Sequence, residues 1–241
     1  MVKIKIVLAL VICLCISLSL SAQNGYHFGT KGGLTIGSQN WNGGERSPLF
    51  SYHIAGFVET LDPNLRGSLF AQLGLHNRGS SLGFRGLNFG NNNRSSYRFR
   101  NISFQVGAKK VLETAVIGAR PYYFVTIRGE YTISNNMREI QDFNTQFLNN
   151  NTFPNGIPAN FIIEAAFVNP WLYGIGIGGG FQFEGSDYFN TALEFSINPD
   201  LNFQYNRLPG QIQGTDALQI RNVSFEVSLV FRFLREIIYT D

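Results

Sequence analysis

The sequence has very little cysteine. Its two cysteines, Cys13 and Cys15, both lie within the first 22 residues, in a stretch that has the features of an export signal. A chain without thiols forms no disulfides, offers no thiolate to a metal and carries no cysteine nucleophile. The sequence therefore excludes thiol chemistry from the mature protein.

Charge and long apolar runs are also scarce. Charged residues make up 15% of the chain, the formal net charge is +3, and no cluster of lysine and arginine gathers on one predicted face. Nucleic acid is therefore excluded as an expected partner. After the first 22 residues no segment reaches the uninterrupted run of about 18 apolar residues that a membrane-spanning helix needs. A helical membrane protein is excluded as well.

The N-terminus has the order of a secretory signal. Two lysines precede the apolar run 6–20, and small residues follow it up to Ala22. We predict cleavage after Ala22, which leaves one domain over 23–241. The alternative is a retained membrane helix, but this run is short of the roughly 20 residues required, and nothing after Gln23 anchors it.

Glycine and phenylalanine are abundant, and apolar residues alternate with polar ones. In the last such run, Phe225, Leu229 and Phe231 alternate with Glu226 and Ser228. A period of two predicts a β-strand with one apolar and one polar face. In a membrane such strands are stable only as a closed barrel, with the apolar face toward lipid.

About eight runs show this alternation. They span 26–36, 50–60, 68–76, 102–109, 122–133, 171–184, 189–198 and 223–233. The connections 37–48, 77–96, 134–170 and 199–216 are long, and those between them are short. An even number of strands with alternating long loops and short turns is typical of outer-membrane barrels, with both termini in the periplasm.

A secreted β-sandwich is the alternative fold, because its strands also alternate. Several runs here reach the roughly 9 to 11 residues that cross a bilayer, whereas globular strands average about 5 to 6. The polar rows are mostly small or uncharged, aromatic residues gather at both ends of the apolar rows, and small inward residues leave room for side chains from the opposite wall. We therefore predict an all-β, eight-stranded antiparallel transmembrane β-barrel with long extracellular loops.

Three short motifs resemble the PorT-like outer-membrane β-barrel family of the Bacteroidota. They are Ser21 to Gln23, the opening strand 29–34 with the sequence GTKGGL, and the final strand that begins with NVSF at 222–225. The resemblance implies a small outer-membrane barrel, with some relatives tied to secretion. The chain departs from the usual pattern after Phe233, where a tail over 234–241 follows the aromatic strand end.

Ionisable side chains on the polar faces are expected to point into the barrel. The predicted interior set is Lys31, His53, Glu59, Lys109, Arg128, Glu130, Glu194, Glu226 and Arg232. They could line an ion path. The favoured interpretation is a packed network, because side chains fill an eight-stranded barrel and opposite charges pair there.

Histidines raise the question of a lipid-modifying enzyme. His53 and His76 lie on neighbouring predicted strands, with Ser51 or Ser68 as possible hydroxyl partners. A nucleophile that acts on lipid should face lipid, whereas the alternation turns His53 inward. Glycine runs lack the context of a phosphate loop, and no metal-ligand spacing occurs. We predict no enzyme activity, no catalytic residue, no cofactor and no metal.

The longest connection carries unusual apolar content. The candidate partner loop consists of Met137, Ile140, Phe147, Leu148, Phe161, Ile163 and Phe167. Its second half could simply extend the sixth strand. Alternatively, a short helix and an extended segment fold over the barrel mouth or present an apolar patch to a partner.

The sequence leaves three functions open. The first is a structural or interaction barrel in the outer membrane that contacts lipid, the barrel-assembly machinery and an envelope or secretion partner. The second is a small passive channel, and the third is the lipid-modifying enzyme.

Overall fold

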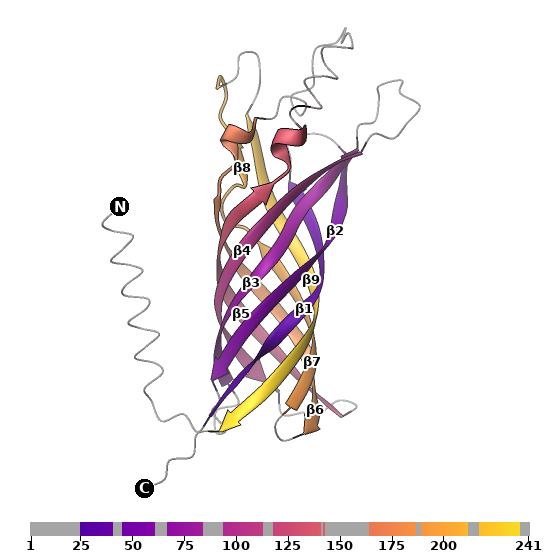
Figure 1. Ribbon diagram of the computed structural model, residues 1–241, viewed down its shortest axis with the longest axis vertical. Helices are drawn as coiled ribbons and strands as arrows, with labels where there is room; N and C mark the ends of the chain where they lie inside the picture. Colours follow the sequence, from indigo (N-terminus) through magenta and orange to yellow (C-terminus); the bar gives the residue numbers. More distant parts are fainter. Residues whose placement is uncertain are drawn as a thin grey trace, which may run out of the picture.

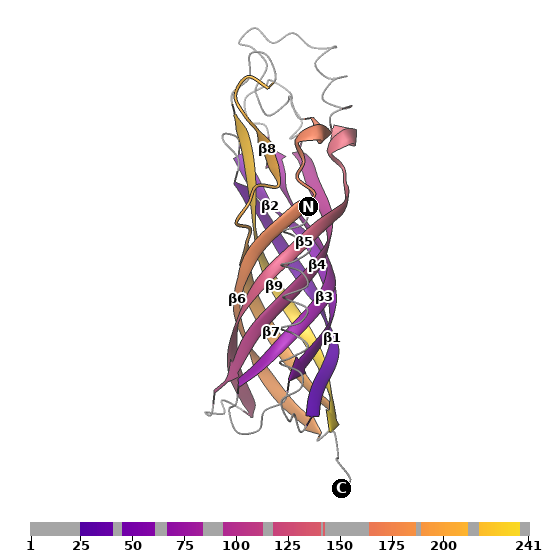
Figure 2. The same ribbon diagram turned by 90° about the vertical axis from the view of Figure 1, so that its left-hand side faces the viewer.

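The chain forms a closed antiparallel β-barrel. The computed structural model describes residues 25–40, 45–60, 67–83, 94–112, 118–140, 142, 164–186, 189–211 and 217–236. The wall strands are β1 (Gly25–Asn40), β2 (Glu45–Thr60), β3 (Gly67–Gly83), β4 (Arg94–Val111), β5 (Ala119–Asn135), β6 (Trp171–Ser186), β7 (Phe189–Pro199) and β9 (Leu218–Glu236). Each pairs with the next around the barrel, and β9 also pairs with β1 (Figures 1 and 2). The predicted eight-stranded barrel is confirmed.

The seam between β1 and β9 closes the wall along its whole length. It runs from Gly25 opposite Glu236 to Asn40 opposite Arg221. A closed wall leaves no strand edge, so its backbone donors and acceptors pair within the wall, as a hydrocarbon environment demands. Residues 234–236 of the predicted tail belong to β9, and 237–241 lie outside the described residues.

The outside of the wall is apolar and the inside polar. On β5, Val125 and Ile127 are 52% and 75% exposed, whereas their chain neighbours Thr126 and Arg128 are almost fully buried. The other wall strands repeat this alternation. A water-soluble sandwich would bury its apolar row, so this exterior is that of a barrel that crosses a membrane.

The strands are longer than predicted at one end of the barrel, which we call the loop end. It is the end with the connections after β3, β5 and β7; the turn end is opposite. Residues 77–83 pair with 94–100, so half of the predicted loop 77–96 is strand. Strands β1 and β2 likewise extend into the predicted loop 37–48 and leave only 41–44 between them. The outward residues of these segments are no longer apolar. The alternation of apolar and polar residues, from which a strand is predicted, therefore stops before the strand does.

The predicted loop 199–216 contains a further short strand. This strand, β8 (Tyr205–Arg207), pairs with the start of β9 at the loop end (Figure 1). The described helical residues, 137–140 and 142, and the 3₁₀ turn η2 (Ala165–Phe167) lie at the same end. Among the described residues, no helix is long and apolar enough to cross a membrane.

Candidate functional site: the charged interior

Every residue of the predicted interior set is buried inside the barrel. The set divides along the barrel axis. The turn-end group is Lys31, Glu59, Lys109, Glu194 and Arg232, and the loop-end group contains His53, Arg128, Glu130 and Glu226.

The turn-end group consists of separate ion pairs. Lys31 Nζ lies 2.7 Å from Glu194 Oε1. Lys109 pairs with Glu59, and Arg232 lies 3.6 Å from the second oxygen of the same carboxylate. Each cation therefore has one carboxylate partner, and the two carboxylates share three cations.

An aromatic side chain joins these pairs. The ring of Tyr122 lies 5.2 Å from the cationic groups of both Lys109 and Arg232, and its hydroxyl donates to Glu194 at 3.2 Å. The same region holds a cavity of about 20 Å³, which has room for about one water molecule. This section of the barrel is filled rather than open.

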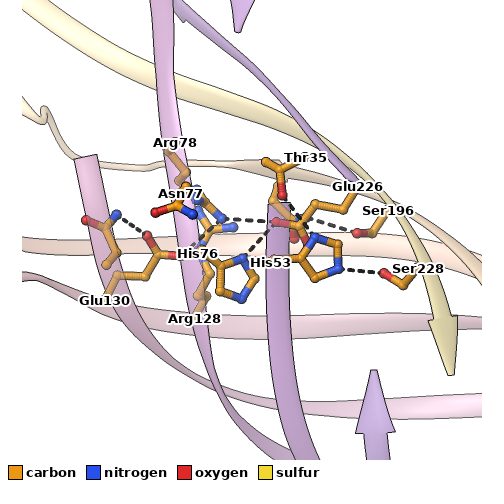
Figure 3. A network of polar contacts seen from close by, with 12 residues as sticks. Thr35, His53, His76, Asn77, Arg78, Arg128, Glu130, Ser196, Glu226 and Ser228 are labelled. Atoms are coloured by element: carbon orange, nitrogen blue, oxygen red, sulfur yellow. Dashed lines mark hydrogen bonds and ion pairs between the residues drawn. The ribbon is translucent and has the colours of Figure 1, made fainter. Parts of the chain in front are cut away.

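The loop-end group is a ring of alternating charges. Arg78 lies 3.0 Å from Glu130 and 3.1 Å from Asp200, while Arg128 lies 3.1 Å from Glu130 and also pairs with Asp200. All four side chains are fully buried. Arg78 also lies 3.7 Å from Glu226. Because each guanidinium contacts at least two carboxylates, the ring crosses the lumen as one connected unit (Figure 3 shows its two arginines and Glu130).

Sequence reasoning missed Arg78 and Asp200, because both fell in predicted loops. A signal for them was present. Arg78 continues the inward row of β3 that contains Gln72 and His76, and Asp200 continues the inward row of β7 after Asn198.

The histidines lie beside this ring. His53 and His76 stack with their ring centroids 5.4 Å apart. His76 Nδ1 lies 2.9 Å from Glu226, and His53 contacts Thr35 and Ser228 through its two ring nitrogens at 2.9 and 2.8 Å (Figure 3). Both histidines are buried in the lumen, so neither ring has access to a lipid outside the wall.

Amide side chains cover the ring on the loop side. Asn222 donates to Asp200 at 2.8 Å and to Gln204 at 3.1 Å, and it accepts from Gln39 at 2.7 Å. Ser80 in turn donates to Gln39 at 2.7 Å. These hydrogen bonds connect four different segments of the chain across the lumen.

An apolar cluster, which we call the cap, lies above the amides. Its buried members are Tyr97, Phe99, Met137, Ile140, Tyr205, Leu218 and Ile220, and Ala165, Phe167 and Val168 pack against it. Of the candidate partner loop, Met137 and Ile140 are buried and Phe167 is half-buried. Phe147, Leu148, Phe161 and Ile163 lie outside the described residues. Met137 and Ile140 thus pack inside the cap.

Glycines of β6 make room for the large inward residues of β5. Gly174 pairs with Arg128, and Gly180 with Tyr122. A Cβ at Gly174 would lie 2.7 Å from the Arg128 guanidinium, and one at Gly180 would lie 2.8 Å from the Tyr122 ring. The predicted role of these small residues therefore needs a correction. They accommodate the neighbouring strand, not the opposite wall.

The interior offers no metal site in the part of the chain that the structure describes: no group of three or more histidine, cysteine or acidic side chains there could hold an ion. The ion pairs of the interior neutralise its buried charges, so these side chains can stay ionised away from water.

No family model and no curated protein matches the chain. Solved outer-membrane barrels are similar in fold. Neisserial surface protein A matches at 8% identity with a TM-score of 0.44, over 86% of this chain and 96% of that one. OprG from Pseudomonas aeruginosa matches at 10% identity and a TM-score of 0.44, over 88% and 97%. Outer Membrane Protein W of E. coli matches at 11% identity and 0.42, over 88% and 99%. At such identities the likeness concerns the fold alone.

Proposed function

We propose that this protein is an integral outer-membrane barrel that conducts no ions and acts through its loop end, as a structural or interaction element. The observation that carries the proposal is the charge ring of Arg78, Arg128, Glu130 and Asp200 beneath the cap. In an eight-stranded barrel the lumen is narrow, and here ion pairs, amides and apolar side chains occupy it in successive layers.

The outer-membrane location is supported by the wall itself. Its exterior is apolar over all the strands, and aromatic residues flank the apolar rows, as Trp171 and Tyr173 do toward the loop end and Phe231 and Phe233 toward the turn end. Such girdles are typical of the two interfaces of a membrane. The signal-like N-terminus supports export, with the loop end outside the cell.

The PorT-like resemblance supports a more specific role in secretion or envelope assembly. On that proposal, a partner binds the loop-end surface and the barrel holds it at the membrane. A lipid-modifying role is not favoured, because the histidines and Glu226 are enclosed in the lumen.

Planar-bilayer recording tests the sealed lumen. The full mature chain, folded in detergent and checked by heat-modifiable migration in gels, should insert without steady current steps. A porin of known conductance in the same membrane confirms that the recordings detect a pore. Single-channel steps from the pure protein that scale with salt concentration would reject the proposal in favour of the passive channel.

The interaction role has its own test. Replacing residues 143–163 by a short glycine-serine linker removes the middle of the long connection. It keeps Met137 and Ile140 of the cap and the segment 164–170, which includes η2. The variant should assemble normally and lose cross-linking to envelope partners on intact cells. A variant that assembles and cross-links to the same partners as the natural chain would exclude this connection as the functional surface.

A further inference from the structure

Acidic and basic residues are distributed differently over the described part of the barrel wall: basic side chains lie both in the lumen and on the outer surface, and acidic ones lie in the lumen. Among the strand residues whose side chains the structure describes, the acidic ones are Glu59, Glu130, Glu194 and Glu226, and all four are buried in the lumen. The exposed charged residues on these strands are Arg98, Arg100, Lys110, Arg120 and Arg221. The charges on the outer surface of the wall, as far as its side chains are described, are therefore all positive.

Strand β4 shows where these charges lie relative to a membrane. Its outward row contains Arg98 and Arg100, continues with apolar residues from Ile102 to Ala108, and ends at Lys110. From position 100 to 110 a tilted strand rises by roughly 25 Å, which matches the height of the apolar band of outer-membrane barrels. Arg100 and Lys110 therefore lie at the two headgroup levels.

Arg100 lies just beyond the aromatic girdle of the loop end. The next outward residue below it, Ile102, pairs with Tyr131, whose ring lies 4.7 Å from that of Trp171. Arg100 Nε donates to Asn77 Oδ1 at 3.4 Å, and the residue is exposed on the wall.

Arg98 is the next outward residue on the same strand. Its backbone N–H donates to Asn136 Oδ1 at 2.8 Å, and the Asn136 N–H donates to its carbonyl oxygen at 3.3 Å, so β4 is held firmly at this point. Neither arginine forms an ion pair with any residue that the structure describes, the exposed Glu139 and Asp142 included. Residues two apart on a strand project from one face about 7 Å apart, close enough for two long side chains to converge on one anion.

We propose that Arg98 and Arg100 bind a phosphate group of lipid A in the outer leaflet of the outer membrane. The argument rests on the proposed outer-membrane location with the loop end outside. Guanidinium groups bind phosphate through paired hydrogen bonds, and they do so best at a partly dehydrated interface. A phosphorylated lipid at this level supplies the negative charge that the wall lacks, while its acyl chains cover the apolar row below Arg100.

Binding of purified bis-phosphorylated lipid A to the full mature chain in bicelles tests this site. We expect the affinity to fall about fivefold for R98Q or R100Q and about 30-fold for the double variant. K110Q, on the same outward row at the turn end, serves as the matched control and should bind as the natural chain does. Raising the ionic strength should weaken binding by the natural chain and leave the double variant little changed.

Further binding measurements distinguish the phosphate of lipid A from soluble anions. Dephosphorylated lipid A should bind the natural chain and the double variant equally, and 50 mM inorganic phosphate should compete only weakly. If a soluble sulfated oligosaccharide displaces lipid A at micromolar concentration, the surface recognises a soluble polyanion and the lipid assignment is wrong. Unchanged affinity in a double variant that shows heat-modifiable migration would also overturn the inference. Failure of the natural chain to insert at all would instead refute the proposed function.

Discussion

The two charged groups inside the barrel use the same residue types in different ways. At the loop end Arg78 and Arg128 each contact at least two carboxylates, whereas at the turn end Lys31, Lys109 and Arg232 each contact one. A planar guanidinium offers several donors in a fixed geometry, so it can link carboxylates where two of them lie within its reach. The loop-end group is therefore one connected unit, while the two turn-end carboxylates are neutralised separately.

The largest expected effect comes from breaking the ring. Arg78→Ala leaves Glu130, Asp200 and Glu226 with less positive charge in a buried site, so the free energy of unfolding should fall by about 3 to 5 kcal/mol. Lys31→Ala at the turn end should cost less, about 1 to 3 kcal/mol, because Glu194 keeps the Tyr122 hydroxyl. Reversible urea unfolding in lipid vesicles measures both. Equal losses would mean that the two groups do not differ as described.

A charge placed outside the wall has nothing to pair with. Leu229 faces outward and is 58% exposed, near the middle of the apolar band. Leu229→Arg should cost about 2 to 4 kcal/mol in the same unfolding assay. The substitution Leu229→Ile is the control and should be nearly neutral. Tolerance of the arginine would contradict the lipid-facing assignment of this row.

Gly174 of β6 leaves the space that the Arg128 side chain of the ring occupies. In Gly174→Ala the new Cβ would lie 2.5 Å from the Pro199 carbonyl oxygen and 2.7 Å from the Arg128 guanidinium, and we expect a loss of about 1 to 3 kcal/mol from overpacking. Gly129→Ala is the matched control, because no atom lies within 4 Å of its Cβ position. If the two alanine variants unfold at the same urea concentration, the packing of Arg128 against β6 is wrong.

The smallest effect concerns the histidine pair between the two charged groups. Ser228→Ala removes the hydroxyl that lies 2.8 Å from His53 Nε2, and it should lower the free energy of unfolding by about 1 kcal/mol. Ser38→Ala on the outward face of β1, half-buried and far from the interior, should change it less. A neutral Ser228→Ala would indicate that His53 finds another partner.

The sequence predicted the interior well wherever the outward row is apolar. Lys31, Glu59 and Glu226 were assigned correctly to the lumen because Leu34, Val58 and Phe225 beside them mark the lipid face. Toward the loop end the outward residues become polar, and the contrast between the faces disappears.

The parts that escaped prediction depend on distant segments. Arg78 and Asp200 stand at positions that would point inward if β3 and β7 continued. No local pattern of apolar residues showed that these two strands do continue that far. The cap was predicted only in part: a fold of Met137 and Ile140 over the barrel mouth was one of two open interpretations, and the partners from other segments were missed. Tyr97, Met137, Tyr205 and Leu218 meet from four segments of the chain, and no local period encodes such a meeting.

The seam between β1 and β9 has a consequence for the timing of assembly. β1 is the first strand to be made and β9 the last, yet they pair along their full length. Until β9 arrives, β1 and β7 both present unpaired backbone groups, which are templates for aggregation. Contacts between such distant residues also form slowly, because a very long loop must close first. Pairing of β9 with β1 is therefore the last step that the wall needs, and it covers both exposed edges at once.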